Sequence, residues 1–305
     1  MQTLPHNDLF LADNLDLLAR QVVEGFIIGL HKSPYHGFSV EFAEHRLHNA
    51  GDSIKDIDWK VFARTEKLYT KKFEEETNLR CQIIIDASSS MYFPEKDSKT
   101  KYNKMEFSCL AAASLMHLLR KQRDAVGLTI FGHEILSQTS AKTNALHHQV
   151  LMTSLYQLIN QTPQQQKTAA AKSLHQIADT IHKRSMVIIF SDMLDAVDEA
   201  ELFLALQHLK HSKHEVILFH VLDKKKELDF EFENRPYRFV DLETGEELKL
   251  QPNQVKDLYI KKMQERKIKL KMKCAQYKID FIEADVQEGF YPVLMAYLVK
   301  RGKMV

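Results

Sequence analysis

The stretch Ile83-Ile84-Ile85-Asp86-Ala87-Ser88-Ser89-Ser90-Met91 joins an apolar run to a cluster of side-chain oxygens. The apolar run is typical of a buried strand, and it ends abruptly at Asp86. Because Asp86, Ser88 and Ser90 alternate along the chain, their side chains can point the same way. One carboxylate and two hydroxyls on a short loop suit a hard cation such as Mg²⁺, which prefers oxygen ligands. The structural alternative is a turn in which the same side chains cap the next helix.

Two distant segments strengthen the cation hypothesis. The run Met186-Val187-Ile188-Ile189-Phe190-Ser191-Asp192 is a second buried-strand pattern that ends in a carboxylate. Thr168 stands just before a helix-like run at 169–182. In open parallel sheets, ligands bind beyond the carboxyl ends of the strands, where the strand order reverses. We therefore expect Asp86 and Asp192 to lie at one such edge.

These elements together resemble the metal-ion-dependent adhesion site of von Willebrand factor A domains, across about residues 80 to 301. The five positions of that site are matched here by Asp86, Ser88, Ser90, Thr168 and Asp192. The resemblance implies Mg²⁺ or Mn²⁺ bound directly by the two serines, directly or through water by Thr168, and mainly through water by the two aspartates. A mostly neutral shell leaves such a cation electrophilic, so a partner's Asp or Glu completes it. One departure is Gln164-Gln165-Gln166-Lys167, which stands where the family has a glycine beside the Thr.

Strand and helix signals alternate from about residue 80 onward, which favours a mostly parallel sheet with helices on both faces. Strands are predicted at about 81–86, 125–131, 134–138, 186–191, 215–222 and 278–282. Helices are predicted at about 104–121, 144–160, 169–182, 197–209 and 291–300. The segment 134–138 follows Gly132 and is expected to be an antiparallel edge strand. The predicted fold class is α/β: a von Willebrand A-like, doubly wound sheet with one antiparallel edge strand.

An insertion-like stretch interrupts this alternation. Residues 229–250 read as a β-hairpin around Thr244-Gly245. A long helix follows at about 255–277, with nine Lys or Arg between Lys256 and Lys278. It could dock an acidic partner or nucleic acid, but a solvated helix face is favoured because its basic residues alternate with apolar ones.

Residues 1–79 differ in character and are predicted to pack, as an α+β segment, on a von Willebrand A-like domain at 80–305. They contain an amphipathic helix pattern at 9–30 and strand patterns at 36–48 and 67–78, too few apolar elements for a core of their own. Between the strand patterns lies Gly51-Asp52-Ser53-Ile54-Lys55-Asp56-Ile57-Asp58-Trp59-Lys60-Val61-Phe62-Ala63-Arg64, which is expected to include a short helix. For Trp59 and Arg64, roles as a core anchor and an ion-pair partner are favoured over contact with a partner protein.

The Gly-Asp, Ile-Asp-Trp-Lys and Ala-Arg elements, followed by a strand and Asp-x-Ser-x-Ser-Met, resemble the bacterial family called domain of unknown function 58. In that family a von Willebrand A-like domain carries this preceding segment, and members often accompany MoxR-type AAA+ ATPases. The resemblance implies a metal-dependent adaptor for protein–protein interaction that works with such an ATPase or its client.

Composition limits the alternatives. The formal charge is +1, from 42 basic and 41 acidic residues, so the chain has no general attraction to nucleic acid or membranes. No apolar run approaches the about 18 to 20 residues of a membrane span, and the first residues lack the pattern of a signal peptide, which predicts a cytoplasmic protein. Three cysteines without metal-site spacing are expected to be buried and reduced.

The competing function is a metal-dependent phosphoester hydrolase on the same residues. Aspartyl-phosphate chemistry needs a second acid two residues after Asp86, where Ser88 stands. Ser89 lacks the flanking glycines of a serine-hydrolase elbow. We therefore expect no enzyme activity. The histidines His147, His148, His208, His211 and His214 are predicted to be surface residues and not zinc ligands.

Overall fold

The computed structural model describes residues 6–31, 45–47, 64, 69–71, 79–95, 102–161, 170–194, 199–242 and 244–302. The chain divides into two compact units, Met1–Phe26 with Leu79–Val305, and Ile27–Asn78. Within the second unit, β1 (His45–Leu47) and β2 (Tyr69–Lys71) pair antiparallel. Thr168 and the helix expected around Trp59 lie outside the described residues.

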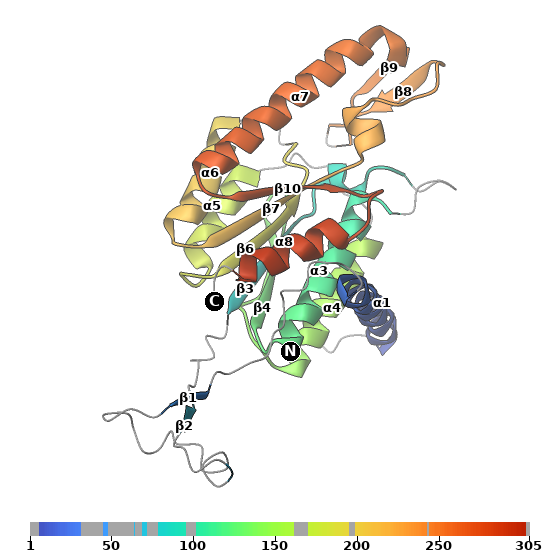
Figure 1. Cartoon of the computed structure of the whole chain (residues 1–305). Helices are drawn as coiled ribbons and strands as arrows, with labels where there is room; N and C mark the ends of the chain where they lie inside the picture. Colours follow the sequence, from blue (N-terminus) through green and yellow to red (C-terminus); the bar gives the residue numbers. More distant parts are fainter. Residues whose placement is uncertain are drawn as a thin grey trace. The chain divides into compact units, whose positions relative to one another are not determined.

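The first unit contains a six-stranded sheet in the order β10-β7-β6-β3-β4-β5 (Figure 1). Its strands are β3 (Arg80–Asp86), β4 (Ala125–Phe131), β5 (Ile135–Gln138), β6 (Met186–Ser191), β7 (Glu215–Leu222) and β10 (Asp280–Asp285). All neighbouring pairs are parallel except β4 with β5. The predicted doubly wound sheet with an antiparallel edge strand is therefore confirmed.

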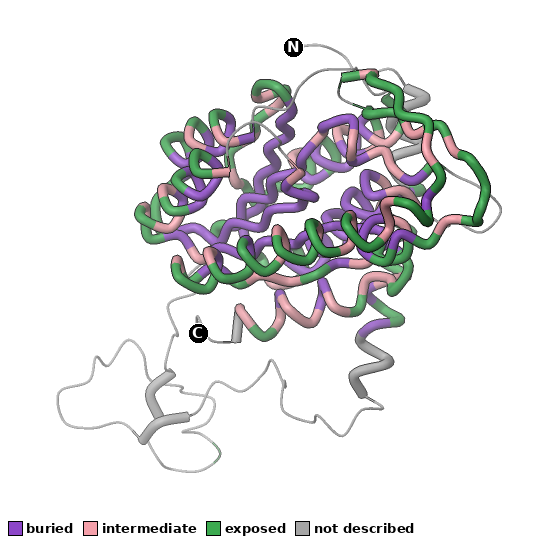
Figure 2. The backbone as a smooth tube through the Cα atoms, turned by 90° about the horizontal axis from the view of Figure 1, so that it is seen from above, coloured by how far each residue is buried: buried purple, intermediate pink, exposed green. Residues whose placement is uncertain are grey.

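The central strands are almost continuously apolar because both faces of the sheet are covered. Every residue of β4 and β6 is buried, and β3 is buried after its first residue. Figure 2 shows these strands as the buried centre of the unit, with exposed turns on the surrounding helices. Alternate residues along each strand point to opposite faces, so each strand contributes apolar side chains to the core on either side of the sheet.

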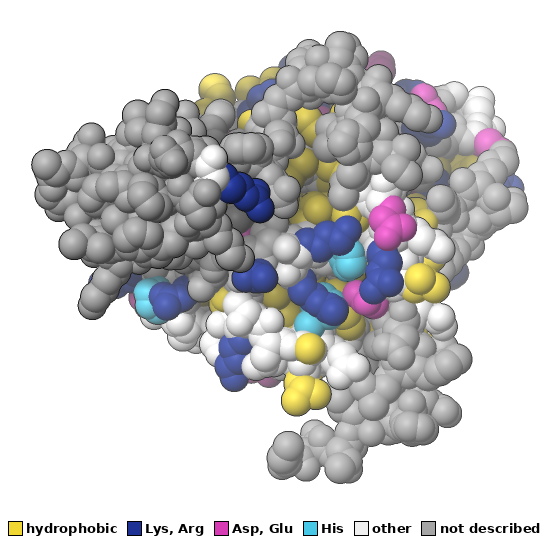
Figure 3. Space-filling model, turned by 60° about the horizontal axis from the view of Figure 1, so that its bottom comes forward, with side chains coloured by type: hydrophobic (Ala, Val, Ile, Leu, Met, Phe, Trp, Pro, Cys, Tyr) yellow, Lys and Arg dark blue, Asp and Glu magenta, His cyan; other side chains and the backbone are white. Residues whose placement is uncertain are grey.

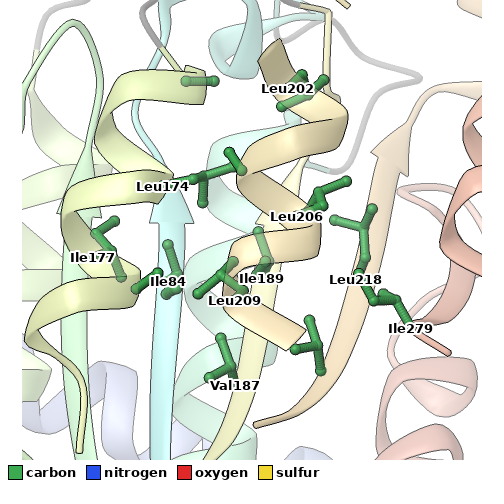
Figure 4. Packing of buried hydrophobic residues seen from close by; sticks show 14 of the residues in the cluster. Ile84, Leu174, Ile177, Val187, Ile189, Leu202, Leu206, Leu209, Leu218 and Ile279 are labelled. Carbon is green, nitrogen blue, oxygen red and sulfur yellow. The ribbon is translucent and has the colours of Figure 1, made fainter. Parts of the chain in front are cut away.

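One face of the sheet packs against α5 (Ala170–Thr180), α6 (Glu199–His211) and the end of α7 (Pro252–Gln276). Figure 4 shows Leu174 and Ile177 of α5 and Leu206 of α6 in one apolar cluster with the strand residues Ile84 and Ile189. The two helices carry these side chains one turn apart, so each presents one apolar stripe to the sheet.

The other face packs against α3 (Lys104–Lys121), which contacts β3, β4 and β7 as well as α4 (Ala145–Asn160) and α8 (Tyr291–Gly302). Because α3 is surrounded, 15 of its 18 residues are buried. A capping box begins the helix: the Asn103 side chain accepts from the Glu106 N–H, and the Glu106 carboxylate accepts from the Asn103 N–H. This cap places Lys104 in the first turn of α3, from which its ammonium reaches Asp192 just beyond the carboxyl end of β6.

The helix α1 (His6–His31) spans the helix pattern predicted at 9–30. Its buried residues are Leu15, Ala19, Val23 and Phe26. The Phe26 ring meets the Tyr291 ring of α8 edge-on at 5.3 Å. Asp16 lies 3.1 Å from Nε2 of His148 on α4. The part of α1 up to Phe26 is thus fixed to the sheet unit by an apolar stripe and by the hydrogen bond between Asp16 and His148.

The insertion begins with a π-helical turn, η3 (Lys224–Leu228), and continues into the hairpin β8 (Tyr237–Val240) and β9 (Glu247–Leu250). The hairpin lies within the predicted stretch 229–250 and leads into α7 (Figure 1). Several basic residues of α7 contact other elements of the fold. Lys269 pairs with Glu199, and Arg266 donates to the Met193 carbonyl at 2.8 Å. Some basic residues of α7 therefore hold this helix against other parts of the fold.

The three cysteines are free and buried, as predicted. None of the described helices combines the length and hydropathy needed to cross a membrane. The prediction of surface histidines is wrong for His148 and His214, which are both buried. His214 directly precedes β7 and contacts Ser185 at the start of β6, and His148 contacts Asp16 of α1.

We expect the protein to lose stability as the pH falls below about 6.5, partly through His214. Its Nδ1 accepts the Ser185 N–H at 3.2 Å, and burial holds the pKa of this imidazole below its usual 6.5. The folded state therefore prefers neutral His214, while the unfolded chain takes up a proton. Stability is retained above the unfolded pKa and is lost as the pH falls through it.

Urea unfolding at about pH 8 and about pH 5.5 measures this loss. His214→Gln should lose less stability between the two pH values than the natural chain. An equal loss in both proteins would show that His214 does not contribute.

Candidate metal centre

The candidate site lies where the strand order of the sheet reverses. Counted along the chain, β3 is the first strand of this sheet and β6 the fourth, and the two are parallel neighbours. Their connections leave in opposite directions, and in open parallel sheets ligands bind beyond the carboxyl ends of the strands at such a point. Ile85 is in register with Phe190, so Asp86 and Ser191 end the two strands side by side.

The loop after β3 folds back on the Asp86 carboxylate. Oδ1 of Asp86 accepts the Ser88 N–H at 2.9 Å, and Oδ2 accepts the Ser191 hydroxyl at 2.6 Å. The hydroxyl oxygens of Ser88 and Ser90 lie 3.0 Å apart. Ser90 also hydrogen bonds to the Asp192 side chain. These contacts close a ring of oxygen atoms between the two strand ends.

A buried lysine joins this ring from α3. The Lys104 ammonium lies 2.7 Å from Oδ2 of Asp192 and 2.6 Å from Oε1 of Glu227 in η3. Lys104 is completely buried, and Asp192 and Glu227 are nearly so. The other Glu227 oxygen accepts the Asp223 N–H at 2.7 Å. Lys104 thus links the Asp192 carboxylate of the candidate site to the start of the insertion.

The two aspartates are in different electrostatic states. Burial, together with repulsion from Asp192, raises the pKa of Asp86 to about 7. Burial also opposes ionisation of Asp192, but the adjoining Lys104 ammonium holds the pKa of this carboxyl below its usual range. Burial works against the charge on Lys104 as well, yet Asp192 and Glu227 together raise the pKa of its ammonium. Lys104 and Asp192 therefore form an ionised pair.

The pKa values of Glu227 and His220, which also lie at this site, are shifted mainly by burial. Burial raises the pKa of Glu227, although Lys104 counteracts part of this effect. Burial lowers the pKa of His220 to about 4, so its imidazole is neutral. Nε2 of His220 lies 3.0 Å from the Asp192 carbonyl and donates to it. This bond fixes the backbone that carries the Asp192 side chain.

The family model described as "Protein of unknown function DUF58" matches residues 44–269. The chain belongs to the DUF58 family. Curated relatives include the uncharacterized proteins Rv1480 of Mycobacterium tuberculosis and Mb1516 of Mycobacterium bovis, each 24% identical over 211 residues. The match covers 69% of this DUF58 chain and 64% of each relative, so the chain spans less than two thirds of their length.

Among solved structures, the protein BatB from Bacteroides thetaiotaomicron is 13% identical, with a TM-score of 0.44, over 74% of this DUF58 chain and 98% of BatB. The SpRpn10 VWA domain is 16% identical, with a TM-score of 0.31, over 47% of this chain and 75% of that domain. An aerotolerance-related membrane protein from Bacteroides fragilis is 14% identical, with a TM-score of 0.46, over 74% of this chain and 99% of its own.

The side chains of this DUF58 site fit a hard divalent cation by their chemistry. Asp86, Ser88, Ser90 and Asp192 offer only oxygen atoms, the donors that Mg²⁺ and Mn²⁺ prefer. Within the described residues, no group of three or more His, Cys, Asp or Glu side chains could hold a metal ion by itself. Two carboxyls, those of Asp192 and Glu227, contact the Lys104 ammonium, while the buried Asp86 carboxyl is repelled by Asp192, a repulsion that a bound cation would relieve.

Four of the five predicted site residues are brought together, and Thr168 lies outside the described residues. Sequence reasoning missed Lys104, Glu227 and Ser191. Ser191 directly precedes Asp192 at the strand end, and this position could have marked it. For Lys104 the available signal was its place just after Asn103, an N-cap residue at the start of an otherwise apolar helix. No local pattern distinguishes Glu227 among the charged residues around it.

Proposed function

We propose that this protein is a divalent-metal-dependent adaptor for protein–protein interaction. The observation that carries this proposal is the convergence of Asp86, Ser88, Ser90 and Asp192 at the point where the strand order reverses. Two carboxylates and two hydroxyls meet there, and these oxygen atoms are the donors that a hard divalent cation prefers.

In this proposal, Ser88, Ser90, Asp86 and Asp192 hold one Mg²⁺ or Mn²⁺, together with Thr168. The bound cation supplies an electrophilic position that a carboxylate from outside completes. Lys104 keeps Asp192 ionised and in place, and Ser191 orients Asp86. The chain's own groups therefore position the acceptor oxygens before a partner arrives.

The partner proposed here donates an Asp or Glu and is a MoxR-type AAA+ ATPase or a client of that ATPase. The support for this choice is the family resemblance described above. The role would be assembly or maturation of other proteins.

Saturating Mg²⁺ or Mn²⁺ is expected to raise the melting temperature, because a ligand selective for the folded state stabilises it by mass action. At one hundred times the dissociation constant the gain is about 2.7 kcal/mol. Asp86→Asn should remove most of this shift, because it removes one of the two acidic ligands. Asp285→Asn serves as the matched control, since Asp285 ends β10 at the sheet edge, away from the point of reversal. A shift of the same size in Asp86→Asn and the natural chain would refute the site.

Partner binding is tested with purified ATPase in the presence of Mg²⁺ and of chelator. Binding should require the metal and should fall in Ser88→Ala while circular dichroism shows an intact fold. Undiminished binding by folded protein in chelator would exclude a metal bridge. Turnover of a generic phosphoester that disappears in Asp86→Asn would favour the hydrolase instead.

A further inference from the structure

A cavity of about 340 Å³ lies between α1 and the end of α3, far from the metal centre. Arg20 and Glu24 line it from α1, and His117, Arg120 and Lys121 line it from α3. Residues three and four positions apart share one face of a helix, so each helix directs its set toward the other. Lys104 begins α3 and these residues end it, which separates the two sites by roughly 20 Å of helix.

The charge around this cavity is unbalanced. Arg20, Arg120 and Lys121 carry three positive charges, and only Glu24 among the lining residues is acidic. None of the three cations forms a salt bridge within the part of the chain that the structure describes. The nearby Asp16 is engaged instead by His148 at 3.1 Å. Like charges brought together in this way repel one another, so an anion between them would be attracted.

His117 adds a buried polar group without a partner. Its exposed fraction is 6%, and within the described structure neither ring nitrogen has a hydrogen-bond partner. A buried donor that is left without a hydrogen bond is energetically unfavourable. Burial lowers the pKa of His117, and the three cations add to this effect while Asp16 opposes it. The neutral ring retains one N–H that can be donated.

We propose that this cavity binds a phosphoryl group, either as free phosphate or as the phosphate monoester of a small molecule. A phosphate dianion would balance the net charge of the three cations and Glu24. Guanidinium groups match phosphate oxygens with two parallel hydrogen bonds, and lysine adds a point charge. The His117 N–H supplies a further donor, and the phosphate gives this N–H a hydrogen-bond acceptor. The cavity is large enough for a phosphate with a small organic group, since ligand pockets begin at about 300 Å³.

Arg20, Arg120 and Lys121 make the surface at this cavity basic. Figure 3 shows one face of the molecule, on which Lys and Arg side chains gather beside histidines and a few acidic side chains. A positive surface of this kind raises the local concentration of anions and speeds their association.

The test is titration of the full-length protein with inorganic phosphate at constant ionic strength, followed by calorimetry and by the NMR signals of the His117 ring. Saturable binding with a shift of the His117 signals is expected. Arg120→Gln should weaken binding about tenfold or more, as for the loss of one charge-assisted hydrogen bond. Glu24→Gln should tighten binding, because it removes the one negative charge. These opposite signs distinguish a specific site from general attraction to a basic surface.

Lys172→Gln, an exposed cation on α5, is the matched control and should leave binding unchanged. Titration with glycerol phosphate distinguishes free phosphate from a phosphate monoester as the natural ligand. If glycerol phosphate binds more tightly than inorganic phosphate, the ligand is a monoester. If it binds equally or more weakly, the ligand is free phosphate. No saturable binding, equal binding in Arg120→Gln, or equal binding of acetate would overturn the proposal. Because the site does not involve Asp86, Asp86→Asn should not alter phosphate binding.

Discussion

Lys104→Met is expected to destabilise the protein by about 3–5 kcal/mol, because it leaves buried carboxylates without their cation. The Lys104 ammonium is completely buried and contacts Asp192 at 2.7 Å and Glu227 at 2.6 Å. Methionine matches the length of lysine, so the loss of packing is small and the loss of charge dominates. Urea or guanidinium unfolding measures the change in the free energy of unfolding.

An exposed ion pair provides the matched control. Lys269→Met removes the partner of Glu199 on the surface, where such pairs contribute only about 0–1 kcal/mol. The double variant Lys104→Met with Glu227→Gln should recover part of the loss, since it removes one of the two unpaired charges. A loss below about 1 kcal/mol for Lys104→Met would contradict the pairing seen here.

Phe190→Ala is expected to cost about 3–5 kcal/mol, the range for truncating a large buried aromatic residue. Phe190 lies in the central strand β6, is fully buried, and stacks on Phe219 of β7 at 5.0 Å between ring centroids. It stands two residues before Asp192. Removing it should therefore also loosen the strand end that carries the site.

Leu204→Ala on α6 is the control, because Leu204 is 49% exposed and its truncation leaves no buried cavity. The melting shift produced by Mg²⁺ gives the second readout. It should shrink in Phe190→Ala beyond what the lower stability alone explains, and it should be unchanged in Leu204→Ala. A Phe190→Ala protein as stable as Leu204→Ala would show that this part of the core repacks freely.

The sheet could be predicted from the sequence because its central strands carry their signal locally. In β3, β4 and β6 both faces are buried, so each strand appears as an almost continuous apolar run of the right length. The bounds of the edge strand β10 were predicted less accurately: the sequence pattern indicates 278–282, and the strand spans Asp280–Asp285. Its residues are mostly half-exposed, and its bounds come from pairing with β7.

By itself the sequence determined the order of strands and helices, and with it the edge at which Asp86 and Asp192 meet, since parallel strands direct their carboxyl ends to one side. Only the tertiary structure decided that Lys104 and Glu227 belong to that site and that His117 is left without a partner. A charged or polar side chain looks the same in sequence whether it is solvated or buried. Its state depends on groups more than eighty residues away, as between Lys104 and Asp192. Such contacts form only when the helices close over the sheet.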